Sequence, residues 1–168
     1  MKFITATYLR DIISYELRLF VDKKSTFAIS VKKINKIKEP FVLCEEGKDI
    51  TLLDDGFYLL EYVPFDKDYI CRVHLNNNGE VVERFFSASK NNMMQDGVPC
   101  FEDLKYSYVC SSAAYKEYNK EALISLLNEK KIDEKDYNAA CKTINLIKDE
   151  IENSSNFIFN LDYKKYIF

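Results

Sequence analysis

The chain has 168 residues, which is enough for one domain with a hydrophobic core and too short for two ordinary domains. Hydrophobic residues make up 47% of it and charged residues 30%, a composition typical of a soluble globular protein. A net charge of -3 gives no indication of nucleic-acid binding, and no stretch approaches the roughly 20 apolar residues that a membrane span needs.

The first third of the chain alternates between apolar and polar residues, which is typical of half-buried β-strands. Two such stretches are joined by Lys23-Lys24-Ser25 and predict a hairpin. The basic stretch 32–38 is interpreted as an exposed strand end or loop, where lysines would protect a sheet edge. A later stretch is apolar on both faces and suits a strand buried in a barrel or sandwich. The strands expected here are 14–22, 27–31, 41–43 and 57–63.

Residues 69–75 alternate again and predict a strand with Arg72 and His74 on one face. His74 is the only histidine of the chain. We interpret it as a cross-strand polar residue, because the sequence offers no visible partner that would make it a base or a metal ligand. If this face neighbours Asp103, Arg72 and His74 could meet a phosphate there. The run Asn76-Asn77-Asn78-Gly79 predicts the next hairpin turn.

Two further strands, 80–87 and 101–110, are expected to lie side by side, joined by a polar segment that contains turn residues. In such a pair, Ser87 on the first strand can face Asp103 and Ser107 on the second. Asp103 and Ser107 are four residues apart, so in a regular strand their side chains point the same way. The pairing therefore predicts that these three side chains lie together.

After Tyr108 the apolar period changes to that of a helix. Asn119 suits an N-cap, and two helices are expected within about residues 119–151, packed against the sheet. The aromatic tail 157–168 alternates and could add a strand or dock on the body; left exposed, it would be a partner-binding surface. Together the elements predict an α+β fold, mainly an antiparallel β-barrel with two C-terminal α-helices, in a single domain over residues 1–168.

The N-terminal part is basic and shows no targeting signal. Residues 1–38 hold nine Lys or Arg against three Asp or Glu, a charge that could steer an anion or simply form a solvated face. No charged segment followed by an apolar core marks a signal peptide. The five cysteines are odd in number and lack CxxC spacing, so we expect no metal or disulfide framework, and a cytoplasmic protein.

Several segments stand in a recognisable order and spacing: Gly56–Glu61 with Pro64, Phe85–Ser89, Gly97–Pro99, Phe101–Tyr108 and Leu123–Ile147. This arrangement resembles the FomD-like family of nucleoside tri- and diphosphate phosphatases, formerly a domain of unknown function. The resemblance covers most of the chain after residue 55 and implies the same barrel fold. It also implies a cluster of carboxylates that holds a Mg or Mn ion against the phosphates of a substrate.

The chain departs from the family pattern at its acidic positions. Asp103 keeps one expected carboxylate, whereas Ser87 and Ser107 stand where Asp is expected, and Asn119–Leu123 replaces an acidic run. Phosphoanhydride hydrolysis needs charge neutralisation by a divalent ion on hard oxygen ligands. The resemblance therefore implies a divergent member whose fold is kept and whose catalytic site is impaired, with Asp103 as its metal ligand.

Neighbouring side chains could compensate in part. Glu83, four residues before Ser87 on the same strand face, could lend a carboxylate, so Asp103 and Glu83 are the candidate catalytic residues. Lys90 and Lys105 could bind phosphate directly as point charges. The candidate substrate-binding residues are Arg72, His74, Lys90, Lys105 and Asn92.

Three functions from different classes stay open. The favoured one is a catalytically impaired phosphohydrolase-fold protein that retains phosphate or nucleotide binding. The second is an active Mg- or Mn-dependent nucleoside tri- or diphosphatase with a rearranged acidic site. The third is a non-enzymatic interaction module, which would bind a protein partner or a second copy of the chain through its aromatic tail. No nucleic-acid or membrane partner is expected.

Overall fold

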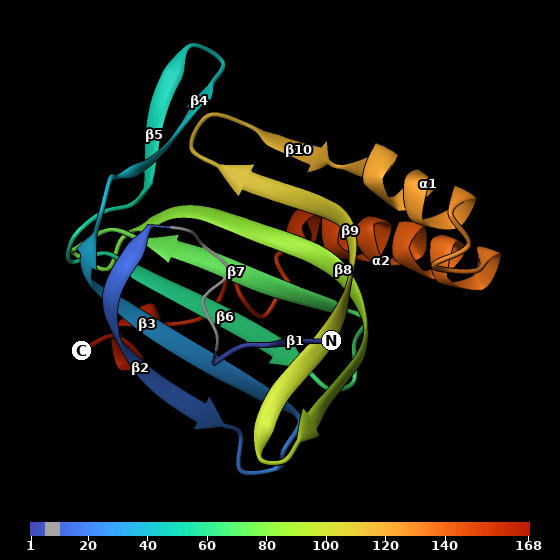
Figure 1. Ribbon diagram of the computed structural model, residues 1–168, viewed down its shortest axis with the longest axis horizontal. Helices are drawn as coiled ribbons and strands as arrows, with labels where there is room; N and C mark the ends of the chain where they lie inside the picture. The colour runs from blue at the N-terminus through green and yellow to red at the C-terminus, as the bar shows by residue number, and fades with distance from the viewer. Residues whose placement is uncertain (6–10) are drawn as a thin grey trace.

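A strongly curved antiparallel sheet forms the body of the protein (Figure 1). In this computed structural model, residues 1–5 and 11–168 are described. The strand order is β1-β9-β8-β7-β6-β3-β2, and β10 pairs with β9. The sheet curls into a half-barrel, so the expected α+β fold with mainly antiparallel barrel character is confirmed. Its strands are β1 (Lys2–Phe3), β2 (Ile12–Val21), β3 (Phe27–Ile37), β6 (Tyr58–Pro64), β7 (Tyr69–Leu75), β8 (Val81–Gln95), β9 (Val98–Ser111) and β10 (Tyr115–Tyr118).

A second, two-stranded sheet projects from one end of the body (Figure 1). It is the hairpin of β4 (Phe41–Glu45) and β5 (Lys48–Leu53), and β4 covers the short strand expected at 41–43. The hairpin forms one wall of a pocket described below.

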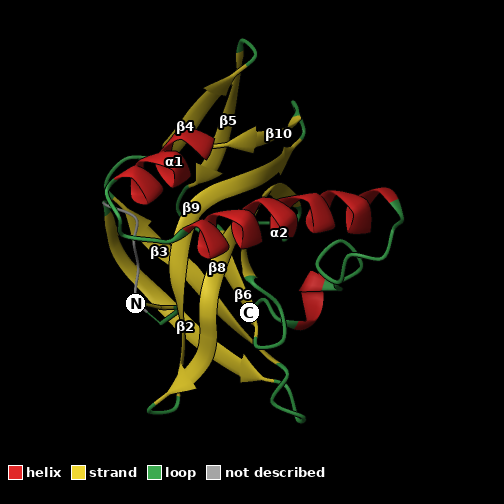
Figure 2. Cartoon of the chain, turned by 90° about the vertical axis from the view of Figure 1, so that its right-hand side faces the viewer, coloured by secondary structure: helices red, strands yellow, loops and turns green. Residues whose placement is uncertain are grey.

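The convex face of the sheet holds the main hydrophobic core. Helices α1 (Lys120–Asn128) and α2 (Glu134–Glu152) lie against this face (Figure 2), so the expected helical pair is confirmed. Ile144 of α2 is fully buried in one cluster with Phe86 and Tyr106 of the sheet. Neither helix, nor any other among the described residues, combines the length and apolarity required to traverse a lipid bilayer.

The two helices begin differently. Asn119 occupies the N-cap position of α1, but it has a left-handed φ of 61° and its side chain makes no capping hydrogen bond. An N-cap side chain normally reaches the first turn from an extended backbone, which explains the missing bond. Asp133 caps α2 in the usual way, because its carboxylate accepts a hydrogen bond from the backbone N–H of Asp136.

The aromatic tail 157–168 docks on the body and adds no strand. It forms turns and one short 3-10 helix, η1 (Tyr163–Lys165). Ile158 is fully buried in the main core, and the ring of Phe159 stacks on Phe86 with centroids 6.3 Å apart. The strand alternative is therefore wrong, and much of the aromatic surface of the tail is covered by the sheet.

At two places a strand continues beyond its apolar pattern, and the expectations for these segments are wrong in part. In the basic stretch 32–38, β3 ends at Ile37 and Lys36 and Lys38 are exposed as expected, but Lys32 is 0% exposed, and β3 lies between β6 and β2 so its lysines protect no sheet edge. The polar segment after Ser87 is also strand, because β8 stays paired with β9 as far as Gln95. Backbone hydrogen bonds to a neighbouring strand maintain regular structure where the side-chain pattern no longer indicates it.

Candidate functional site

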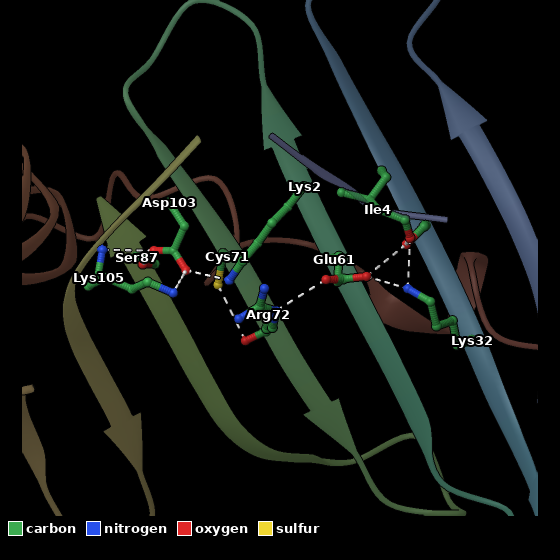
Figure 3. Close-up of polar contacts among 10 residues, drawn as sticks. Lys2, Ile4, Lys32, Glu61, Cys71, Arg72, Ser87, Asp103 and Lys105 are labelled. Atoms are coloured by element: carbon green, nitrogen blue, oxygen red, sulfur yellow. Dashed lines mark hydrogen bonds and ion pairs between the residues drawn. The ribbon is translucent and has the colours of Figure 1, made fainter. Parts of the chain in front are cut away.

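Ser87, Asp103 and Ser107 lie together on the concave face of the sheet, as the strand pairing predicts. The Ser87 hydroxyl donates a hydrogen bond to Asp103 Oδ1 (2.9 Å; Figure 3), and the Ser107 hydroxyl donates to the Ser87 oxygen (3.3 Å). Both serines are buried. The result is a polar cluster in which one carboxylate carries the only negative charge of the three side chains.

A β-bulge in β9 aims Asp103 at the two serines. Ser87 pairs with Ser107 and Ser89 pairs with Asp103, so two steps along β8 correspond to four steps along β9. Lys105, inside the bulge, has a left-handed φ of 71°, and its backbone N–H donates a 2.8 Å hydrogen bond to Asp103 Oδ1. The three side chains therefore converge through a bulge, which the regular alternation of a strand does not predict.

The second oxygen of Asp103 is held by two lysines. Lys2 Nζ lies 2.6 Å from Oδ2, and Lys105 Nζ lies 3.5 Å from the same atom (Figure 3). Lys2 reaches this point because β1 pairs with β9, with Lys2 opposite Phe101. Burial would raise the pKa of Asp103, but the hydrogen bond and charge of Lys2, supported by Lys105, lower it to about 2. The carboxylate is therefore ionised at neutral pH.

A second buried cluster lies beside the first, on β3, β6 and β7 (Figure 3). Glu61 is ion-paired with Lys32 and with Arg72, whose Nε lies 3.1 Å from Glu61 Oε1. The backbone carbonyl of Ile4 accepts hydrogen bonds from Lys32 Nζ (2.7 Å) and from the Ser30 hydroxyl (2.9 Å). The N-terminal segment thus crosses the concave face and bonds to both buried clusters.

A pocket of about 380 Å³, with Arg72 among its lining residues, opens between the β4–β5 hairpin and strands β6 to β10. Its polar groups include His74 and Glu83, both buried, with His74 Nδ1 3.5 Å from Glu83 Oε1. His74 is therefore a cross-strand polar residue, as the sequence indicated. Most of the wall is apolar or aromatic, with Phe85 and Tyr118 among the lining residues. An aromatic wall with a few convergent polar groups suits a flat ring that carries hydrogen-bonding atoms.

The structure does not bring Glu83 to Asp103. Glu83 lies six residues before Ser89, the cross-strand partner of Asp103, which is roughly 20 Å along an extended strand. Its carboxylate faces His74 in the pocket instead. A catalytic role for Glu83 stays a prediction, but the two carboxylates occupy different places on the concave face.

Two of the candidate substrate-binding residues are engaged in contacts within the fold. Lys90 Nζ lies 2.6 Å from a carboxylate oxygen of Asp136 on α2. The Asn92 side-chain amide donates to the backbone carbonyls of Pro64, Lys67 and Tyr69. These bonds fix the connection between β6 and β7, and a role in ligand binding stays a prediction for both residues.

Sequence reasoning did not identify Lys2 or the buried pair of Lys32 and Glu61. Lys2 is 101 residues away from Asp103 in the chain. The only signal was the excess of positive charge in residues 1–38, which singles out no individual lysine.

The donor set around Asp103 does not fit the Mg or Mn ion that the family resemblance implies. Divalent ions of this kind need several hard oxygen ligands, and carboxylates must supply most of the negative charge. Here Asp103 Oδ1 accepts two hydrogen bonds, and Oδ2 is paired with two ammonium groups. Within residues 1–5 and 11–168, no group of three or more His, Cys, Asp or Glu side chains is arranged to hold a metal.

Comparison of the sequence with family models and with curated proteins yields no match. Two solved structures share the fold. The phosphatase SC4828, solved with the non-hydrolyzable nucleotide GPCP, matches with a TM-score of 0.60 at 7% identity, over 92% of this chain and 89% of that one. FomD in complex with CDP matches with a TM-score of 0.54 at 9% identity, over 84% and 86% of the two chains. At these identities the likeness establishes a common fold and nothing further.

Proposed function

We propose that this chain is a catalytically impaired protein of phosphohydrolase-like fold that retains binding of a phosphate-containing ligand, with a nucleotide as the best-fitting class. The observation that carries the proposal is the pairing of Asp103 with Lys2 at 2.6 Å. The ammonium lies against the carboxylate that a divalent ion would need as its ligand. It removes the metal site and leaves positive charge on the same face.

The oxygen donors around Asp103 support the proposal of impaired hydrolysis. Metal-dependent phosphoryl transfer needs an ion that neutralises the transferred group and aligns the attacking water. Ser87 and Ser107 are neutral donors whose hydroxyls are already bonded within the cluster. One carboxylate and two hydroxyls provide too little negative charge to hold a divalent ion tightly.

The pocket beside Arg72 supports nucleotide binding. Phe85 and Tyr118 offer aromatic surface against which a base can pack, and Glu83 and His74 offer hydrogen-bonding groups. Arg72 lines this pocket and is also ion-paired with Glu61 in the second buried cluster. A nucleotide with its base in the pocket would therefore place its phosphates toward Arg72 and Lys2. Both fold neighbours were solved with a nucleotide, GPCP in one case and CDP in the other.

Calorimetric titration with nucleoside di- and triphosphates, run beside a phosphate-release assay with Mg and then Mn, tests this proposal. The expected result is binding without release. Tyr118→Ala should weaken binding roughly tenfold, since a lost stacking contact is worth about 1–3 kcal/mol. Tyr115→Ala is the matched control, because it is an equally exposed tyrosine of β10 that does not line the pocket. Absence of binding by the unaltered chain would contradict the proposal.

An active Mg- or Mn-dependent nucleoside tri- or diphosphatase is the second candidate, and the fold likeness to the phosphatase SC4828 favours it. It would require a rearranged acidic site, in which ligand phosphates complete the coordination around Asp103 or around Glu83. Metal-dependent release of phosphate by the unaltered chain would select this candidate. If an Asp103→Asn variant released phosphate equally well, the metal would be held at Glu83 and not at Asp103.

A further inference from the structure

We infer that Lys2, carried in by β1, substitutes for the divalent cation, and that Lys2, Arg72 and Lys105 together bind a phosphate-type anion without metal. The inference rests on the proposed function and deepens it, because it states which groups neutralise the ligand. The ligand class is a di- or triphosphate group, either free or attached to a nucleoside.

The geometry around Asp103 favours an ammonium over a metal ion. Lys2 Nζ lies 2.6 Å from Oδ2, while Oδ1 accepts the Ser87 hydroxyl at 2.9 Å and the Lys105 backbone N–H at 2.8 Å. The Asp103 side chain is only 9% exposed. An entering divalent ion would have to displace a bonded ammonium from a buried carboxylate. The two serines supply no charge to offset that loss.

Counted over residues 1–5 and 11–168, the charged cluster on the concave face contains more cations than anions. Four basic side chains and two carboxylates leave a formal charge of about +2 for the cluster. The six residues are Lys2, Lys32, Arg72, Lys105, Glu61 and Asp103. A bound phosphate would bring this balance toward zero.

Lys105 and Arg72 both lie close enough to Lys2 to repel its ammonium. Burial lowers the pKa of Lys2, and repulsion by Lys105 and Arg72 lowers it further, although Asp103 acts in the opposite direction. A phosphate between these groups would relieve the repulsion. The ligand can reach them, because the side chains of Lys2 and Lys105 are 28% and 45% exposed.

The rest of the fold holds these cations in position before any ligand arrives. Ile4 is fully buried, and its carbonyl accepts hydrogen bonds from Ser30 and Lys32, which anchors the segment that carries Lys2. The carboxylate of Glu61 holds the guanidinium of Arg72 in place by pairing with the arginine Nε. A preorganised set of donors loses little conformational entropy on binding, which is the property a permanent substitute for a metal ion requires.

The decisive measurement is calorimetric titration of the full chain with inorganic triphosphate, in EDTA and again with excess Mg²⁺. Binding is expected in EDTA and is expected to weaken with Mg²⁺, because the metal neutralises the phosphate in solution. Lys2→Ala should weaken binding in EDTA by roughly tenfold to a hundredfold, the range for loss of a charge-assisted hydrogen bond. Lys2→Arg should restore most of it, and Lys24→Ala, an exposed lysine in the β2–β3 turn, should leave it unchanged.

Should Lys2→Ala unfold, Lys105→Ala provides a second test, because the half-exposed side chain of Lys105 contributes less to folding. This variant is expected to bind triphosphate severalfold more weakly. Binding that requires Mg²⁺, or that is unaffected by both substitutions, would overturn the inference. Titration with CDP in EDTA separates the two proposals. CDP binding without triphosphate binding would overturn this inference and leave the proposed function standing, whereas failure of both ligands would overturn both. Tighter binding of CDP than of inorganic diphosphate would identify the nucleotide as the preferred source of the phosphates.

Discussion

On its convex face the sheet packs Phe86 and Tyr106 against two helices and the aromatic tail, whereas on its concave face it buries Glu61 and Asp103 beneath the N-terminal segment (Figures 1 and 3). The convex side is held mainly by apolar contact, which tolerates many side chains of the right size, although Lys90 also pairs with Asp136 of α2. The concave side combines an apolar cluster around Ile4 and Phe101 with matched buried charges, each of which needs a specific partner. The concave face, which carries the candidate site, should therefore tolerate fewer substitutions than the convex face.

The second difference concerns what each face contributes to function. The convex core packs the helices and the tail on the sheet, and the guanidinium of Arg84 there lies over the Phe159 ring and donates a hydrogen bond to the Tyr163 hydroxyl. The concave clusters supply the cations proposed to bind phosphate, and they also close the N-terminal segment onto the sheet. Substitutions on the two faces should consequently separate stability from binding.

The largest expected effect is that of Lys32→Met on the concave face. The substitution removes one of the two cations that neutralise the buried carboxylate of Glu61. The free energy of unfolding should fall by about 3–5 kcal/mol. Urea denaturation measures this loss. Lys33→Met, the next residue on the opposite face of β3, should change the free energy by less than about 1 kcal/mol. Equal effects of the two substitutions would contradict the contrast between the faces.

On the convex face, Ile144→Ala should destabilise the fold by about 3 kcal/mol, because it leaves a cavity in the main core. Leu146→Ala on the exposed side of the same helix is the matched control and should have little effect. Phosphate binding by folded Ile144→Ala should be unaltered. A selective loss of binding in this variant would mean that the two faces are not independent.

Asp103→Asn should lower the free energy of unfolding by about 2 kcal/mol at pH 7. The pKa of Asp103 in the folded chain, about 2, lies below its ordinary value of 3.8, so the ionised carboxylate stabilises the fold above about pH 4. This contribution disappears as the pH falls toward 2. Urea denaturation of the unaltered chain and of the variant across this pH range measures the difference in their free energies of unfolding. A difference that grows as the pH falls would contradict the low pKa of Asp103.

The smallest expected effect concerns metal affinity. Ser87→Asp with Ser107→Asp should create a site for Mn²⁺, and adding Lys2→Met should strengthen Mn²⁺ binding by about tenfold, or about 1.4 kcal/mol, because it removes a competing cation. Electron paramagnetic resonance of free Mn²⁺ reports the affinity. If Lys2→Met weakens or does not change Mn²⁺ binding in this background, Lys2 does not stand in the position of the ion.

Much of the fold was predictable from local pattern. Alternation predicted the strands around Arg72 and Ser87, and helical spacing predicted the pair that ends near Ile151, because these signals reflect which side of each element meets the core. The pattern failed where backbone pairing alone maintains a strand, as in β3 around Lys32 and in β8 toward Gln95.

The candidate site was predictable only in part. Ser87, Asp103 and Ser107 could be grouped from neighbouring strands, although a bulge centred near Lys105 brings them together. Glu83 shares a strand face with Ser87, yet the distance along β8 keeps it with His74 instead. Spacing along one strand indicates direction but does not indicate which partner across the sheet a side chain meets.

The sequence by itself determined the alternating strands, the helical pair and the shortage of carboxylates at the site, because each of these is a property of composition or of near neighbours in the chain. Only the tertiary structure decided that Lys2 pairs with Asp103 and that Lys32 is buried against Glu61. These pairs join residues that are 101 and 29 positions apart. Both pairs form because the sheet curls and the N-terminal segment crosses its concave face. A lysine side chain is otherwise exposed, and its burial is tolerated only where a carboxylate pairs with its ammonium.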